Sequence, residues 1–463
     1  MQNQTDDKTG QKVVLFVTTV TTILTPYMSS SINIALPSIG KEFDLDAVTL
    51  SWVATIYLLA SAVFCVPFGR LADIFGRRKV FLLGITIFTL SSFLLTGVSS
   101  GALLIALRGL QATGAAMIYG TGIAILVSVY PPKDRGKVLG INAAATYIGL
   151  SVGPFIGGFL TQNFGWRSIF IAIIPLGLLV IAACLWKMRW ERGLVKREKF
   201  DLVGSAIYSL TIVSVMYGFS SLPQLDGILF VTAGFIGAVV FTVWEMKIKN
   251  PILNLKLLLS NRTFAFSNLA ALVNFSSTYA INFLMSLYLQ YIRGFTPLNA
   301  GAILLSMPAM QAILSPFVGR LSDRIRPQII AATGMGITAL GLSSFIFLTD
   351  TTPLPVLIVS LMICGTGLSL FASPNSNAVM SSIDIGSYGV ASGTMQTMRL
   401  IGQNLSLAMA TLIIALLIGR VQIKEEHYPA FLQCVKTAFL IMSPLAVTGV
   451  FASLAGRRKK PKG

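Results

Sequence analysis

Long apolar blocks alternate with short polar segments from one end of the chain to the other. A helix that crosses the hydrocarbon core of a bilayer needs about 20 mainly apolar residues, and fourteen blocks are long enough. The pattern therefore predicts an all-α membrane protein with fourteen transmembrane helices. We expect these helices near residues 13–37, 48–68, 79–98, 102–129, 138–160, 167–186, 202–220, 227–246, 265–290, 299–318, 328–348, 354–379, 388–418 and 432–455.

The composition agrees with a lipid environment. Of the 463 residues, 54% are hydrophobic and only 11% are charged, whereas soluble domains carry about 25% charged residues. The net charge of +18 raises the question of nucleic-acid binding. However, the basic residues fall in short loops and form no face interleaved with aromatic residues. We therefore expect the lipid bilayer, and not nucleic acid, as a partner.

The positions of Lys and Arg predict the orientation, because cytoplasmic loops carry an excess of these residues. With both termini inside, the inner tails and loops hold 27 of the 35 basic residues, and six lie outside. The other two, Arg108 and Arg399, fall within spans. This asymmetry predicts a multi-pass protein of the cell (plasma or inner) membrane with both termini in the cytoplasm.

The chain contains an internal repeat. GRLADIFGRRK at Gly69–Lys79 recurs 250 residues later as GRLSDRIRP at Gly319–Pro327, each time at the start of an inner loop. The repeat predicts an N-terminal six-helix bundle at 1–190 and a C-terminal six-helix bundle with a basic tail at 263–463. Two inserted helices with their flanking loops occupy 191–262. Parallel repeats of this kind are typical of secondary transporters, whose substrate site lies between the halves.

Four segments carry a resemblance to a known family. SINIALPSI (Ser31–Ile39) lies in the first span, GRLADIFGRRK follows the second, RGLQATGAA (Arg108–Ala116) lies in the fourth, and GLSVGPFIGG (Gly149–Gly158) lies in the fifth. In this order and placement they resemble the major facilitator superfamily, and in particular its fourteen-helix drug/proton antiporters. The resemblance covers nearly the whole chain and implies the major facilitator fold and multidrug-type efflux. We expect a small-molecule substrate, alternating access and a functional monomer.

The repeated loop motif is a candidate for gating. Its glycines permit a tight turn with close helix approach. Its aspartate can face the positive end of a neighbouring helix or pair with a loop cation. A contact made in one state and broken in the other would act as a latch; alternatively, these charges only fix the topology. The gating candidates are Gly69, Asp73, Gly76, Arg77, Arg135 and, in the second copy, Asp323.

The fifth span carries a second gating motif. Gly149, Gly153 and Gly157 lie on one helical face, where they permit close helix approach, and Gly158 follows them. Pro154 removes a backbone hydrogen bond and favours a kink. The resemblance implies that this motif seals the two halves together on the outer side. Plain helix packing would explain the same pattern.

Arg108 is the strongest single candidate for a functional residue, because a charge within a span is costly and usually serves a function. Gln111 lies one helical turn further on, and Tyr119 two turns beyond it. The resemblance implies a role for Arg108 in proton exchange. The alternative is that its side chain extends to the outer interface.

Polar stripes run along the first, ninth and thirteenth spans, and Arg399 lies on the last of them. Lipid does not tolerate such stripes, so they face the bundle interior or a water-filled cavity. Interhelical hydrogen bonding explains each stripe equally well, but their presence in three helices favours a shared polar cavity. The candidate cavity residues are Ser29, Asn33, Asn274, Thr278, Asn282, Gln311, Gln396 and Gln403.

The family usually has an acidic residue where this chain has Met28, and none of the 17 Asp and Glu residues falls in the middle of a span. Proton coupling usually needs a titratable group inside the membrane. Two interpretations follow. One is an exporter of small organic or drug-like molecules coupled to protons through an edge carboxylate or through the substrate. The other is a proton-independent or anion-selective exporter or facilitator, in which Arg108 and Arg399 attract negative charge.

Motifs of other protein classes are missing from the sequence. We find no Walker-type loop, no HExxH and no paired aspartates within spans, so we expect neither enzyme activity nor a cofactor. The single histidine, His427, and four widely separated cysteines predict no metal site.

Overall fold

The computed structural model describes residues 2–187, 200–248, 251–253, 255–383 and 388–456. Fourteen helical stretches in this part of the chain are long and apolar enough to cross a membrane, so the predicted number of spans is confirmed. The inserted pair consists of α8 (Leu202–Ser221) and α9 (Leu225–Lys247). The other helices are α1 (Gln2–Phe43), α2 (Ala47–Phe75), α3 (Arg77–Thr96), α4 (Gly101–Val129), α5 (Pro132–Phe164), α6 (Ser168–Ile171), α7 (Ile173–Lys187), α10 (Leu255–Ser260), α11 (Arg262–Thr278), α12 (Ala280–Leu287), α13 (Pro297–Leu304), α14 (Ser306–Arg324), α15 (Pro327–Ser344), α16 (Leu354–Ser381), α17 (Tyr388–Leu417) and α18 (Tyr428–Ala455).

Several spans predicted as continuous are interrupted in the structure. The ninth comprises α11, α12 and a π-helical turn, and the tenth comprises α13 and α14. The backbone hydrogen bonds nevertheless continue across both breaks. The N–H of Tyr279 bonds the carbonyl oxygen of Phe275 at 3.3 Å, and that of Leu305 bonds Gly301 at 3.0 Å. These interruptions are therefore local irregularities within single membrane crossings.

Local signals explain where α2 begins and ends. Asp46 caps its first turn by accepting hydrogen bonds from the backbone N–H groups of Val48 and Thr49, both at 2.9 Å. Gly76 separates α2 from α3 with φ at 110°, a conformation that side chains other than glycine rarely adopt. The tight turn expected of the loop motif is therefore centred on Gly76.

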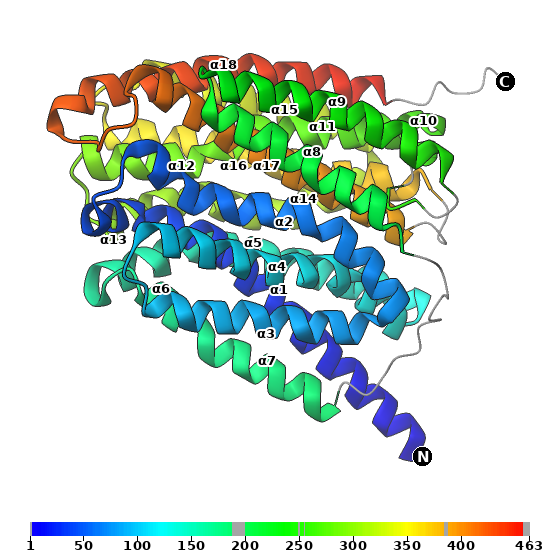
Figure 1. Cartoon of the computed structure of the whole chain (residues 1–463). Coiled ribbons are helices and arrows are strands. Elements are labelled where there is room, and N and C mark those ends of the chain that lie inside the picture. The colour runs from blue at the N-terminus through cyan, green and yellow to red at the C-terminus, as the bar shows by residue number, and fades with distance from the viewer. Residues whose placement is uncertain (1, 188–199, 249–250, 254, 384–387, 457–463) are drawn as a thin grey trace.

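The helices lie side by side in one elongated bundle, with α3 and α7 at one edge and α15 and α18 at the other (Figure 1). The beginning of α1 and the end of α18 lie at the same end of the bundle, which we call the termini end. Two hydrogen bonds join α1 to the end of α4 there: Gln11 Nε2 donates to the Val129 carbonyl at 3.4 Å, and Tyr130 Oη donates to the Gln11 carbonyl at 2.8 Å. The opposite side is called the far end.

The inserted helices α8 and α9 pack against each other, and α8 also contacts α2 and α17. Tyr208 of α8 donates its hydroxyl proton to the carbonyl oxygen of Ala62 in α2 at 2.9 Å. The hairpin therefore touches one helix from each of the two predicted bundles. The division at 1–190, 191–262 and 263–463 stays a prediction.

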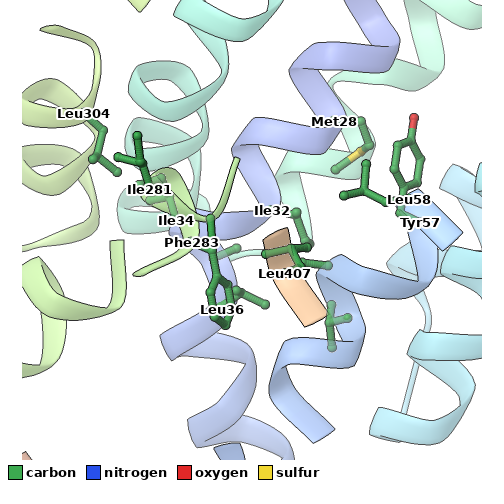
Figure 2. Close-up of a cluster of buried hydrophobic side chains, with 14 of the residues drawn as sticks. Met28, Ile32, Ile34, Leu36, Tyr57, Leu58, Ile281, Phe283, Leu304 and Leu407 are labelled. Carbon is green, nitrogen blue, oxygen red and sulfur yellow. The ribbon is translucent and has the colours of Figure 1, made fainter. Parts of the chain in front are cut away.

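An apolar cluster joins helices from the two repeats (Figure 2). Met28, at the position where an acid is usual in the family, is fully buried in this cluster. The cluster excludes water between α1, α2, α12, α13 and α17. The residues labelled in Figure 2 are Met28, Ile32, Ile34, Leu36, Tyr57, Leu58, Ile281, Phe283, Leu304 and Leu407.

Candidate functional site

A cavity of about 410 Å³ lies between the helices and reaches the termini end. Its volume falls in the range of about 300–1,000 Å³ that is typical of small-molecule sites. The lining comes from α1, α2, α4, α5, α17, the α11–α12 junction and residues 251–253. Its polar lining residues are Thr22, Thr25, Ser29, Tyr57, Ser61, Arg70, Asp73, Arg77, Tyr119, Asn142, Thr146, Tyr279, Ser392, Thr394, Gln396, Arg399 and Gln403.

Hydroxyl and amide groups connect opposite walls of this cavity. The hydroxyl oxygens of Ser29 and Tyr279 lie 2.5 Å apart, which joins α1 to the α11–α12 junction. Asn142 Nδ2 donates to Thr22 Oγ1 at 2.8 Å, which joins α5 to α1. Such groups can change partners and bind the polar atoms of a solute.

Arg399 supplies positive charge to the cavity wall. Its guanidinium carbon lies 5.2 Å from the centre of the Phe275 ring, within the range of a cation–π contact. The described lining contains a single carboxylate, Asp73, which lies at the termini end and pairs with Arg77. The wall therefore combines three arginines, one carboxylate, aromatic rings and neutral polar groups.

The structure brings some of the predicted site residues together. Of the substrate-cavity candidates, Ser29, Gln396 and Gln403 line the cavity. Tyr119 and Arg399 line it as well, and so do Gly69, Asp73 and Arg77 of the loop motif.

The other substrate-cavity candidates, Asn33, Asn274, Thr278, Asn282 and Gln311, lie outside the cavity lining. Thr278 donates to the Asn274 carbonyl at 2.8 Å, so its own helix satisfies its hydroxyl. Asn33 instead lies at a contact between helices. Its backbone carbonyl oxygen accepts a hydrogen bond from the Ser286 hydroxyl at 2.7 Å. These polar side chains turn away from lipid without facing the cavity.

Arg108 is completely buried, so its side chain does not extend to the interface. Its Nε donates to the Val53 carbonyl at 3.3 Å and its Nη1 to Gln111 Oε1 at 2.5 Å. Gln111 in turn donates to Ser92 Oγ at 2.7 Å. The guanidinium carbon lies 4.4 Å from the centre of the Tyr57 ring. Tyr57 lines the cavity and Arg108 does not, so the ring stands between the charge and the cavity.

The loop motif is held by a short ion pair. Arg77 Nη2 lies 2.8 Å from Asp73 Oδ1, and its Nη1 donates to the Ala124 carbonyl at 3.2 Å. The pair therefore ties the α2–α3 turn to α4. The side chains of Arg135 and Asp323 lie outside the described part of the structure.

The glycines of the fifth span lie at close helix contacts. An added Cβ atom would overlap the Ile23 carbonyl at Gly149 and Ser30 at Gly153, and would lie 2.8 Å from Ser31 Cβ at Gly157. These three glycines therefore permit α5 to pack directly on α1.

The next glycine of this span permits a contact at the far end. A Cβ atom at Gly158 would overlap the Pro297 carbonyl, and one at Gly301 would overlap the Pro154 carbonyl. The backbones of α5 and α13 are therefore in direct contact, and each helix contributes one of the two glycines. This contact, together with the apolar cluster, closes the bundle at the far end.

Several lining residues had no signal in the sequence. Tyr57 and Tyr279 sit within apolar blocks, where aromatic residues are ordinary, so nothing marked them as part of a site. Asn142 could have been noticed in the sequence as a polar residue near the start of the fifth span. The structure shows that it faces Thr22. The described residues contain no cluster of His, Cys, Asp and Glu that could hold a metal ion.

A helical bundle of fourteen spans, with a solute-sized cavity closed at one end, has the form of a membrane transporter. The chain belongs to the Major Facilitator Superfamily, whose sequence model matches residues 18–407. The family resemblance, the major facilitator fold and the expectation of a transporter rather than an enzyme are confirmed.

Known relatives include proteins named for drug transport and for vitamin transport. The Multidrug resistance protein Stp of Mycobacterium tuberculosis is 31% identical over 83% of this chain and 72% of its own length. The Riboflavin transporter RibZ of Clostridioides difficile is 28% identical over 97% of this chain and 98% of its own. A chain from structural work on proton dependent oligopeptide transporters has the same fold, with a TM-score of 0.67 and 14% identity, covering 96% of this chain and 98% of that one.

Proposed function

We propose that this transporter exports small organic or drug-like molecules from the cell in exchange for protons. The two bundles, 1–190 and 263–463, rock about the cavity so that it faces each side of the membrane in turn. In this proposal a single chain is the functional unit, it sits in the cell membrane, and its termini end faces the cytoplasm. Relatives named for drug resistance and efflux support this direction of transport.

The asymmetry of the cavity carries the proposal. Its lining extends to Asp73 and Arg77 at the termini end, whereas α5 and α13 are in backbone contact at the far end. This arrangement fits a state that loads substrate from the cytoplasm. The opposite state requires the α5–α13 contact to open and the loop motif at the termini end to close.

The roles of the buried residues follow from their places around the cavity. A solute that presses on Tyr57 moves the ring that covers Arg108, and the guanidinium then exchanges its contact with Gln111 or Val53. Arg108 and Gln111 thereby couple occupancy of the cavity to helix packing, and Tyr119, which lines the cavity, contacts the solute. The Asp73–Arg77 pair is the latch in this proposal: it is formed while the termini end is open, and it breaks when the loop motif closes that end against the C-terminal bundle.

Transport into inside-out membrane vesicles tests the proposal. We suggest ethidium as a cationic probe, riboflavin as a neutral probe and fluorescein as an anionic probe, each with the pH gradient present or collapsed by nigericin. Proton exchange predicts accumulation of at least one probe that stops when the gradient is collapsed. Accumulation that is indifferent to the gradient, with vesicles that lack the transporter as the blank, would overturn the proton-coupled part of the proposal.

A second candidate function is proton-independent transport of neutral or anionic solutes. It is favoured by the charges of the cavity wall, where Arg399 faces the cavity and the described carboxylate, Asp73, is paired. In the same vesicles this candidate predicts uptake of fluorescein or riboflavin without a gradient and no uptake of ethidium.

A further inference from the structure

Two buried carboxylates lie on the inserted helices at the termini end. Asp201 stands at the start of α8 and is 7% exposed, and Glu245 stands in the last turn of α9 and is 1% exposed. Carboxylates are almost never fully buried unless they are paired. This placement therefore calls for a functional explanation.

Asp201 has its hydrogen-bond partners in place. Its Oδ1 accepts the backbone N–H of Gly204 at 2.8 Å, which caps α8. The indole N–H of Trp244 points at the same carboxylate, 3.0 Å from Oδ2. Both carboxylate oxygens of Asp201 thus have hydrogen-bond donors.

Glu245 is only half satisfied. Its Oε2 accepts the backbone N–H of Leu253 at 2.9 Å, and the N–H of Ile252 also faces the carboxylate. Its Oε1 is buried and has no hydrogen-bond partner among the described residues. A buried carboxylate oxygen without a donor favours the protonated form, since the O–H can then make the missing hydrogen bond.

The Asp201 carboxylate lies close to the unsatisfied oxygen of Glu245. A Cβ atom added at Gly204 would overlap Asp201 Oδ2 and lie 3.0 Å from Glu245 Oε1. The two oxygens therefore lie within about 5 Å of each other, where like charges disfavour double ionisation. A proton on Glu245 removes the repulsion between the two carboxylates.

The pair is connected to the cavity. Glu245 anchors the segment 251–253, and this segment lines the cavity at the termini end. Arg70 of the loop motif faces Glu245 and lines the cavity as well. The charged groups that face Glu245 in the described structure are Asp201 from α8 and Arg70 from α2, and the side chain of Lys256 in α10 lies outside it.

We propose that Glu245, paired with Asp201, is the proton-binding site through which the inserted helices couple transport to the pH gradient. In the opposite state, Glu245 takes a proton from water that enters from the far end, which forms one O–H bond on a Glu245 oxygen. In the state described here, release returns that proton to water at the termini end. The charged form of Glu245 attracts Arg70, and the neutral form releases it toward the cavity. Each proton thereby changes the contact between the inserted hairpin and the loop motif. This inference rests on the proposed proton exchange.

Trp244 supplies a test of the site that needs no substrate. Because its indole bonds Asp201, its fluorescence reports a change of charge in the pair. In the purified full chain, emission is scanned from about pH 5 to about pH 9, and the spectrum of a Trp244→Phe variant is subtracted to remove the other tryptophans. The parent is expected to show a sigmoidal change that is lost in Glu245→Gln. A change that persists in Glu245→Gln would overturn the assignment.

Transport then tests the coupling. Glu245→Gln is expected to lose accumulation driven by the pH gradient and to keep exchange of labelled for unlabelled probe, measured with riboflavin in proteoliposomes. Asp226→Asn is the matched control, because Asp226 is exposed at the opposite end of the same helix. Loss of both activities in Glu245→Gln, with normal size-exclusion behaviour, would contradict a coupling role. If the parent shows no gradient dependence but the fluorescence titration is present, the proton exchange fails and the proton-binding site stands.

Discussion

The contact between α5 and α13 makes a sharp prediction about Gly301. An alanine at this position places its Cβ atom over the Pro154 carbonyl oxygen and 2.9 Å from the carbonyl carbon. Both atoms belong to the backbone, so no side-chain rotation can relieve the overlap. Gly301→Ala is therefore expected to force the far end of the bundle apart.

The size of the effect follows from this distance. Non-bonded carbon atoms prefer a separation of about 3.5–4.0 Å, so the two helices must move apart by about 1 Å. Overpacking of this kind costs about 1–3 kcal/mol. The strain exists only while the far end is closed. The ratio of closed to open molecules therefore falls about tenfold for each 1.4 kcal/mol of strain.

Spin labels across the far end can measure this change. Asn163 at the end of α5 and Asn299 in α13 are both exposed, so each can be replaced by a labelled cysteine. The four native cysteines, all buried, are first replaced by serine. We expect a longer distance distribution by double electron–electron resonance in Gly301→Ala than in the parent.

Gly336→Ala is the matched control, because a Cβ atom at Gly336 in α15 meets nothing within 4 Å. Both changes raise helix propensity, so a difference between them reflects the contact and not the helix. An unchanged distance distribution in a well-folded Gly301→Ala protein would refute the account of the far-end closure.

Three further predictions concern the cavity and its surroundings. Arg108→Ala is expected to abolish transport in vesicles although the protein reaches the membrane, since it removes the charge buried behind Tyr57; retained transport would refute this role. Asp73→Asn is expected to change the free energy of unfolding by no more than about 0.5 kcal/mol, because the Arg77 pair is partly exposed, while transport slows severalfold; a normal rate would leave the pair as a topology signal. Arg399→Gln is expected to raise the KM for fluorescein about tenfold and to leave that for riboflavin unchanged; equal changes would show that Arg399 does not select by charge.

The number of spans could be predicted because a bilayer imposes a length and an apolar composition on each crossing separately. The breaks at Tyr279 and Leu305 were not predicted, because apolar content averaged over a whole span does not resolve a single irregular turn. The close packing of one face of the fifth span also followed from local spacing, since Gly149 and Gly153 recur on that face, but its partner α1 did not. The contact of Gly301 with the Pro154 carbonyl depends on three-dimensional packing, and no spacing marks it.

The cavity was predicted in part. Polar stripes show which helical face avoids lipid, and of the residues selected in this way Ser29, Gln396 and Gln403 line the cavity. The same reasoning placed Thr278 in the cavity, although a hydroxyl on a membrane helix can be satisfied by the carbonyl four residues earlier, as it is here at 2.8 Å. Sequence distinguishes lipid from interior, but it does not distinguish a wet interior from a dry one.

The apolar cluster around Met28 has a consequence for the conditions under which the far end opens. Tyr57 is the one titratable side chain labelled in Figure 2, and a tyrosine ordinarily stays neutral below about pH 10. The strength of this closure therefore does not follow the acidity of the medium. Apolar burial weakens on cooling, so temperature controls it instead. Cooling is therefore expected to favour the open far end.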